Sequence, residues 1–224
     1  MNAMSRTSLA RSEDNEPVVY VVDDDPSVRF ALSELLMSTG LRVHTFASSQ
    51  EFLAHPRHTG PSCLILDVRL RGESGLTFQQ ELIKNNVPIP VLFMTGHGDI
   101  EMSVKAMKAG AIDFLPKPFR DQDMLDAVEQ AIRRDRERLE AEECTAALRA
   151  AYKSLTVREK EVMALVVTGL LNKQIAWTMN LSEITVKTHR GQAMKKMSAV
   201  SVADLVRKAE ALGLAKGVPQ PQRG

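Results

Sequence analysis

Short apolar runs alternate with amphipathic stretches along residues 17–120, and this alternation restricts the fold more than any other feature of the chain. The strand candidates are Val18–Val22, Leu41–Thr45, Cys63–Leu66, Ile89–Met94 and Ile112–Leu115. Helical patterns lie between them, near residues 26–39, 48–55, 75–85 and 100–109, and again from 121 onward. Strands that alternate with helices are typical of βαβ units. The sequence therefore predicts an α/β fold built on a parallel sheet.

The rest of the chain has a different composition. Residues 1–16 show no apolar periodicity, so we expect a disordered leader there and a flexible tail at 214–224. Residues 121–152 are rich in charged side chains and alanine and contain no glycine or proline, which predicts one long helix that serves as a linker. Its apolar residues follow a 3–4 spacing at Leu125, Val128, Ile132 and Leu139, which leaves a coiled coil open as an alternative. Residues 153–213 show helical patterns only.

The net charge of +1 conceals an asymmetry between these segments. Residues 153–224 carry a net charge of +7, so the rest of the chain is acidic. Such an imbalance indicates a nucleic acid or another acidic partner for the C-terminal part.

Other bulk features exclude several classes of protein. No apolar run approaches the roughly 18–20 residues that span a membrane, and no signal peptide is recognisable, so we expect a cytoplasmic protein without a membrane partner. Cys63 and Cys144 are far apart and in no ligand spacing. Cys63 opens an apolar run, which favours a small buried side chain over a disulfide.

Polar side chains stand at the ends of the strand candidates. They are Asp23, Asp24 and Asp25 after the first, Asp67 after the third, Thr95 after the fourth and Lys117 after the fifth. The carboxyl ends of parallel strands share one edge of a sheet, so these side chains are expected to lie close together. An acidic triplet alone is more often a solvated loop. An aspartate directly after a buried strand and a lysine between two prolines are harder to explain in that way.

These residue types together suit phosphoryl transfer. Carboxylate oxygens are the ligands that Mg²⁺, or another divalent cation such as Mn²⁺, takes in proteins. A carboxylate can also act as a nucleophile and form an acyl phosphate. A lysine and a hydroxyl donor can then neutralise and orient the phosphoryl oxygens.

The C-terminal helical patterns predict a helix-turn-helix. Thr156 and Glu159 have the spacing of a capping box that opens a first helix. Asn172 is expected to cap a short helix over residues 173–179, and Ser182 is expected to cap a third from Glu183 to about Met197. Val202–Leu212 makes a fourth helix. A short helix, a tight turn and a longer helix are the parts of this motif.

The third of these helices has two distinct faces at about 100° per residue. One face holds Val186, Ala193 and Met197, with His189 and Arg190 on its flanks. The opposite face holds Lys187, Thr188, Gly191 and Lys195. Such a face can enter a major groove, but a basic face is usually only solvated, so periodicity alone leaves DNA binding open.

The motifs at the strand ends resemble a known signature. They are Val21–Asp25, Leu66-Asp67, Met94–Gly96 and Lys117–Phe119. Together they resemble the receiver domain of two-component response regulators, and residues 96–114 are especially similar to the FixJ-like branch of the FixJ/NarL family. The resemblance implies a flavodoxin-like (CheY-like) fold with a five-stranded parallel sheet of order 2-1-3-4-5. Residues 17–120 would form its core.

The same resemblance implies roles for single residues. Asp67 would accept the phosphoryl group, and Mg²⁺ would be held by Asp23, Asp24, Asp67 and the backbone carbonyl of Arg69. Thr95 and Lys117 would hold phosphoryl oxygens, Thr95 and Phe114 would form a switch, and no residue is assigned as catalytic. A cis Lys117–Pro118 bond is also implied. Leu70-Arg71 replaces the Met-Pro common in relatives, which is expected to alter the loop and not the chemistry.

The C-terminal segment is similar to the DNA-binding domains of the LuxR/NarL/FixJ type over residues 153–213. The matching motifs are Leu155–Val162, Gly169–Ala176 and Thr185–Arg190. The resemblance implies that Lys187 and Thr188 face bases. It also implies that Lys173, His189, Arg190 and Lys195 contact phosphates. Gly191-Gln192 departs from the usual pattern and leaves the base preference there open.

These observations predict a transcription regulator phosphorylated by a sensor histidine kinase. Its further partners would be double-stranded promoter DNA, a second copy of the chain after phosphorylation, and RNA polymerase. A phosphohydrolase with Asp67 as turnover nucleophile is an alternative, but it requires a substrate-recognition insert that these short loops do not contain. A phosphorelay module without a DNA role would not require the basic helix-turn-helix. The sequence therefore predicts that the protein is not an enzyme.

Overall fold

The computed structural model describes residues 16–96 and 100–214 of the chain, so most of the predicted leader and tail lies outside the described residues. The chain divides into two compact units between Leu139 and Glu140, within the long helix α6 (Asp121–Lys153). None of the helices in these two described ranges has both the length and the apolar character needed to cross a membrane.

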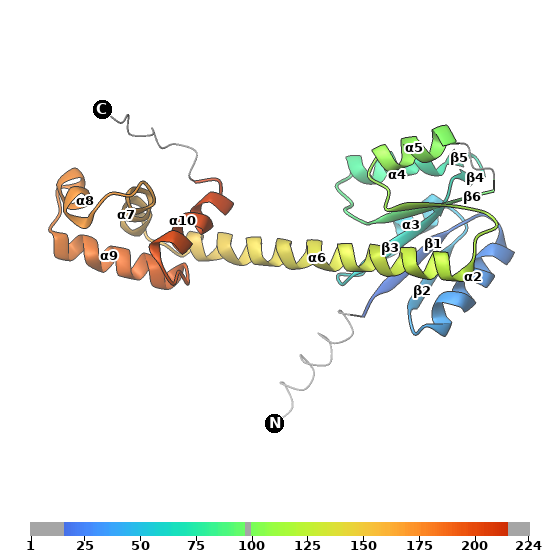
Figure 1. Cartoon of the computed structure of the whole chain (residues 1–224), viewed down its shortest axis with the longest axis horizontal. Coiled ribbons are helices and arrows are strands. Elements are labelled where there is room, and N and C mark those ends of the chain that lie inside the picture. The colour runs from blue at the N-terminus through green and yellow to red at the C-terminus, as the bar shows by residue number, and fades with distance from the viewer. Residues whose placement is uncertain (1–15, 97–99, 215–224) are drawn as a thin grey trace, which may run out of the picture. The chain divides into compact units, whose positions relative to one another are not determined.

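The first unit is built on a sheet of five parallel strands (Figure 1). The strands are β1 (Val18–Val22), β2 (Arg42–Phe46), β3 (Ser62–Asp67), β6 (Val91–Thr95) and β7 (Asp113–Pro116). Their order across the sheet is β2-β1-β3-β6-β7, which is the predicted order 2-1-3-4-5 when only these strands are counted. A separate two-stranded hairpin pairs β4 (Arg69–Leu70) with β5 (Glu73–Ser74).

Helices cover both faces of this sheet. They are α2 (Pro26–Ser38), α3 (Ser49–Ala54), α4 (Gly75–Lys84), α5 (Ile100–Lys108) and the first half of α6. Val19 and Val21 of β1 face a core completed by α2 and α6, whereas Tyr20 and Val22 face a core completed by α3, α4 and α5. The alternation follows because successive side chains of a strand point to opposite faces. Cys63 is fully buried in the first of these cores, as predicted.

An acidic residue interrupts the apolar stripe of α6 for a structural reason. Asp135 is only 1% exposed, and its carboxylate accepts a hydrogen bond of 2.9 Å from the backbone nitrogen of Ser62. Arg138 pairs with the same carboxylate at 2.9 Å. A buried charge is tolerated when it is paired and hydrogen-bonded. Asp135 therefore attaches α6 to the start of β3.

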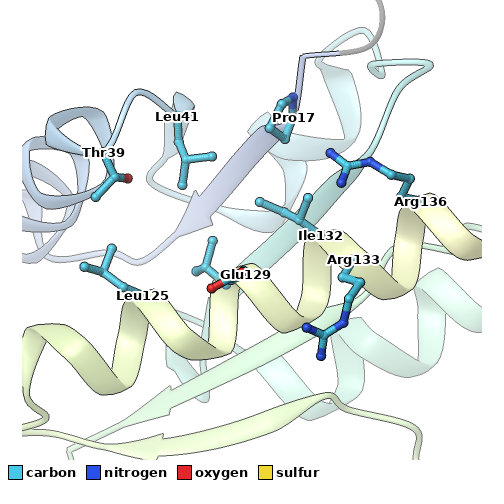
Figure 2. Close-up of a pocket in the computed structure, with 9 residues that line it drawn as sticks. Pro17, Thr39, Leu41, Leu125, Glu129, Ile132, Arg133 and Arg136 are labelled. Atoms are coloured by element: carbon cyan, nitrogen blue, oxygen red, sulfur yellow. The ribbon is translucent and has the colours of Figure 1, made fainter.

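A cavity of about 430 Å³ lies beside the first half of α6. Its apolar wall includes Leu41, Leu125 and Ile132, and Arg133 and Arg136 extend from α6 beside it (Figure 2). Pro17, which precedes β1, also lines it, so the cavity lies at the amino ends of the strands. It is therefore separate from the strand ends that carry the aspartates.

Among the residues that the structure describes, the second unit is built from helices. It contains α7 (Val157–Val167), α8 (Asn172–Met179), α9 (Glu183–Lys196) and α10 (Val202–Ala211). Buried residues of all four helices form one core, with Val162, Ile175, Val186 and Leu205 among them. Leu148, Ala151 and Tyr152 from the end of α6 pack against it, so the last turns of α6 contribute to the core of the second unit.

The helix caps agree with the prediction at two places and differ at one. Thr156 and Glu159 form the predicted capping box, and Ser182 caps α9 through a hydrogen bond from the backbone nitrogen of Thr185. The prediction that Asn172 caps α8 was wrong, because Asn172 is the first helical residue and Leu171 is the cap. The Gln174 side chain accepts a hydrogen bond from the backbone nitrogen of Leu171 instead.

Candidate functional site

Three aspartates meet at the carboxyl edge of the parallel sheet. Asp23 follows β1 and Asp67 ends β3, and these strands are neighbours with Val22 opposite Leu66. Carboxylate oxygens of Asp23, Asp24 and Asp67 all lie within 4.8 Å of one another. Asp23 is fully buried and Asp67 is 9% exposed. The predicted convergence of these side chains is therefore present.

Asp25 has a different position from its two neighbours. It is the N-cap of α2, and its carboxylate accepts a hydrogen bond of 2.8 Å from the backbone nitrogen of Ser27. That hydrogen bond lowers the pKa of Asp25, because it stabilises the ionised form. The acidic triplet thus combines a helix cap with two members of the cluster.

Lys117 lies between two of the clustered carboxylates. Its Nζ is 2.7 Å from Oδ2 of Asp23 and 3.0 Å from Oδ2 of Asp67. Burial acts to lower the pKa of Lys117, but the hydrogen bonds to both aspartates outweigh it and raise this pKa. The ammonium group is therefore held charged at the cluster. The Lys117–Pro118 peptide bond is cis, as the resemblance implies.

The electrostatics of Asp23 show how crowded the cluster is. Burial raises the pKa of its carboxyl group, although the hydrogen bond from Lys117 opposes this effect. Its Oδ1 also accepts a hydrogen bond of 2.8 Å from the backbone nitrogen of Asp25. Several carboxylates so close together are stabilised by a cation, and a set of hard oxygen donors fits Mg²⁺ or Mn²⁺.

The segment after Asp67 is held close to the cluster by its backbone. The backbone nitrogen of Arg69 donates a hydrogen bond of 3.1 Å to Oδ1 of Asp67, and that of Gly75 donates one of 2.9 Å to the carbonyl of Val68. A Cβ added at Gly75 would lie 2.3 Å from the carbonyl oxygen of Asp67. The helix α4 can begin here only because residue 75 has no side chain. Sequence reasoning missed this glycine, because it stands at the amino end of a helix, whereas glycine usually marks the position after the carboxyl end.

We expect Gly75→Ala to lower the free energy of unfolding by about 1–3 kcal/mol, because the methyl group overpacks a close backbone contact. Urea denaturation measures this change. Gly191→Ala is the matched control, since a Cβ there meets nothing within 4 Å. Alanine is also the better helix former, so the control should unfold at the same or a higher urea concentration. Equal stability of Gly75→Ala and the wild type would contradict the steric argument.

The two predicted switch residues lie on neighbouring strands. Thr95 ends β6 and is fully buried at the edge that carries Asp67. Phe114 on β7 is paired with Phe93 in the strand register, and the centroids of the two rings are 6.4 Å apart. Phe114 is half-buried against the core to which α5 contributes. Residues 97–99 of the motif that follows Thr95 lie outside the described residues.

Arg71 makes a contact with the cluster that sequence reasoning missed. Its Nε is 3.0 Å from Oδ2 of Asp24. The replacement of Met-Pro by Leu70-Arg71 was expected to change only the loop. In the structure, this replacement also brings the guanidinium group of Arg71 into contact with the carboxylate of Asp24.

The faces of α9 agree with the prediction. Val186, Ala193 and Met197 are buried, whereas Lys187, Thr188 and Lys195 are exposed. Lys173 on α8 is exposed as well. The division leaves a basic, solvent-facing side of α9, as a helix that enters a major groove requires.

The flanking residues of α9 have structural contacts of their own. His189 and Arg190 are half-buried, and Arg190 donates a hydrogen bond of 2.8 Å to Oδ1 of Asn172. This bond connects α8 to α9, which explains why Asn172 does not act as a cap. Lys196 pairs with the buried Glu159 at 2.7 Å, so this lysine holds α9 against α7.

The sequence matches two known protein families. Residues 19–129 match the family described as "Response regulator receiver domain". Residues 153–209 match "Bacterial regulatory proteins, luxR family".

Individual relatives match across both units. Nodulation protein W of Bradyrhizobium diazoefficiens is 54% identical over 197 residues, which cover 88% of this chain and 87% of the relative. Response regulator protein TmoT of Ectopseudomonas mendocina is 48% identical over 199 residues, with 89% and 90% of the two chains covered. The solved structure of response regulator StyR matches with a TM-score of 0.79 at 48% identity, over 87% of this chain and 98% of that one.

Proposed function

Because the chain belongs to the two-component response regulators that join a receiver domain to a LuxR-type DNA-binding domain, we propose that Asp67 accepts a phosphoryl group from a sensor histidine kinase. Phosphorylation then controls DNA binding and transcription. The observation that carries this proposal is the position of Asp67, whose carboxylate lies beside Asp23 and Asp24 and 3.0 Å from Nζ of Lys117.

The chemistry follows from this arrangement. A carboxylate oxygen of Asp67 forms a bond to phosphorus while the bond from phosphorus to the donor breaks, and the electron pair of that bond leaves with the donor. Asp23, Asp24, Asp67 and the carbonyl of Arg69 would hold Mg²⁺, which supplies positive charge to the transferring group. Lys117 supplies a second positive charge, and Thr95 supplies a hydroxyl donor.

The enzyme alternative has less support. Among the described residues, the strands of the receiver domain are joined by short loops, one small hairpin and single helices, with no inserted domain that could recognise a substrate. A phosphohydrolase also leaves the helix-turn-helix without a role. We therefore propose that the acyl phosphate is lost only by slow hydrolysis and that the protein is a regulator, which acts on DNA in the cytoplasm.

The basic side of α9 is the proposed reading surface for double-stranded promoter DNA. Lys187 and Thr188 lie toward the start of the helix, where a recognition helix contacts base edges. Lys173, His189, Arg190 and Lys195 would contact phosphates. Arg190 can do so only with the nitrogen atoms that its bond to Asn172 leaves available.

Phosphorylation is expected to dimerise the full chain. When Thr95 moves toward the phosphoryl group, the ring of Phe114 can turn inward, and the surface formed by α5, β7 and the start of α6 repacks. This surface carries both signs of charge, as a self-complementary two-fold interface can use. Its charged residues include Lys105, Lys108, Arg120, Asp121 and Asp123.

Sedimentation of the full chain with and without a small phosphodonor tests this function. We expect a monomer to become a dimer and to bind DNA more tightly, because two recognition helices then reach two half-sites. Thr95→Ala should weaken the dimerisation and leave the labelling of Asp67 largely intact. If the oligomeric state is the same after full phosphorylation, dimerisation is not the output, and release of an inhibited DNA-binding domain explains regulation better.

A further inference from the structure

Each carboxylate of the acidic cluster is paired with a basic side chain. Lys117 contacts Asp23 at 2.7 Å and Asp67 at 3.0 Å, and Arg71 contacts Asp24 at 3.0 Å. The three carboxylates are thus opposed by only two positive charges from side chains, those of Lys117 and Arg71. Lys117 already has a role toward the phosphoryl group, but the proposed function leaves Arg71 without one.

The backbone of Arg71 is fixed although its side chain is exposed. Arg71 and Gly72 form the two-residue turn between the paired residues Leu70 and Glu73. Gly72 has a φ of +84°, which this turn requires and which glycine adopts without strain. Leu70 is buried, and Glu73 accepts a hydrogen bond from the hydroxyl of Ser49, so the hairpin is anchored on both sides.

Lys117 and Arg71 differ in how easily each can be displaced from its carboxylate partners. The side chain of Lys117 is 22% exposed and lies between two carboxylates. The side chain of Arg71 is 86% exposed and contacts one carboxylate. An exposed ion pair of this kind contributes little stability. A dication can therefore take Asp24 from Arg71 at low cost, but the guanidinium remains tethered nearby.

We propose that Arg71 competes with Mg²⁺ for Asp24 and so raises the Mg²⁺ concentration that the receiver domain requires. The inference rests on the proposed function of the cluster as a Mg²⁺ site. Arg71 is a positioning residue: it acts through Asp24 and touches neither the phosphoryl group nor the donor. Its positive charge repels the dication whether or not the hydrogen bond to Asp24 is broken.

Isothermal titration of the full-length, unphosphorylated protein with Mg²⁺ tests the proposal. Removal of one charge a few ångströms from the dication should tighten binding by about three- to tenfold after screening by water and salt, so Arg71→Gln should show this gain. Arg71→Lys keeps the charge and should bind Mg²⁺ like the wild type. Arg207→Gln is the matched control, because the side chain of Arg207 is 68% exposed and pairs with Asp204 in the second unit, outside the receiver domain.

The Mg²⁺ dependence of labelling by a small phosphodonor supplies a second readout. The Mg²⁺ concentration for half-maximal rate should fall in Arg71→Gln by the same factor, while the rate at saturating Mg²⁺ stays unchanged. If Arg71→Gln binds Mg²⁺ as tightly as the wild type or more weakly, the proposed role of Arg71 is wrong, but the metal site itself is not affected. Failure of the wild type to bind Mg²⁺ at all overturns both this inference and the metal site on which it rests.

Discussion

Asp67→Asn is expected to gain no phosphoryl group from a small phosphodonor and Mg²⁺, whereas the wild type gains one. The amide has the size and shape of the carboxylate, but it lacks the negatively charged oxygen that attacks phosphorus. The substitution also removes one of the three negative charges that attract the metal. Intact-protein mass spectrometry detects the mass of one phosphoryl group directly.

Asp25→Asn is the matched control for this substitution. Asp25 is close in sequence to the cluster, but it caps α2, and asparagine is an equally good N-cap. The control should therefore be labelled like the wild type. Urea denaturation should show that both variants are folded. Equal labelling of Asp67→Asn and the wild type would remove Asp67 from the role of phosphoacceptor.

Lys187→Ala is expected to weaken binding of the phosphorylated full chain to its selected DNA site by about 1–3 kcal/mol. The lysine is exposed on the basic side of α9, where a side chain can reach a base edge in the major groove. The site can be obtained by selection from a random pool with the wild-type protein. Fluorescence anisotropy at several salt concentrations then gives the affinities of both proteins.

Lys173→Ala provides the contrast within the same surface. A phosphate contact carries no sequence information, so this variant should lose affinity for selected and unrelated DNA alike. Its log–log salt slope should also become shallower by about 0.9. Lys187→Ala should instead lose more affinity for the selected site than for unrelated DNA. Unchanged affinity of Lys187→Ala for the selected site would exclude this lysine from base recognition.

Three of the contacts that sequence reasoning missed join residues that lie 18 or more positions apart in the chain. Arg71 pairs with Asp24, Asp135 binds the backbone of Ser62, and Arg190 binds Asn172. Asn172 illustrates the consequence. Its residue type and position predict a helix cap, but Arg190 from the next helix donates a hydrogen bond to its side-chain oxygen. Leu171 is the N-cap of α8, and the side chain of Gln174 accepts a hydrogen bond from the backbone nitrogen of Leu171.

The resemblance to receiver domains implied the strand order. The sequence by itself determined the α/β class of residues 17–120, the helical character of residues 153–213 and the meeting of Asp23, Asp24 and Asp67. These features follow from local patterns, because strand and helix periods decide which residues are buried and parallel strands bring their carboxyl ends to one edge. Only the tertiary structure decided what lies against those residues. Residue 75 must be glycine because the carbonyl of Asp67 approaches it, and Arg71 reaches Asp24 because a tight turn carries it to the sheet edge. The paths of two separate segments set such distances, and no periodicity within either segment encodes them.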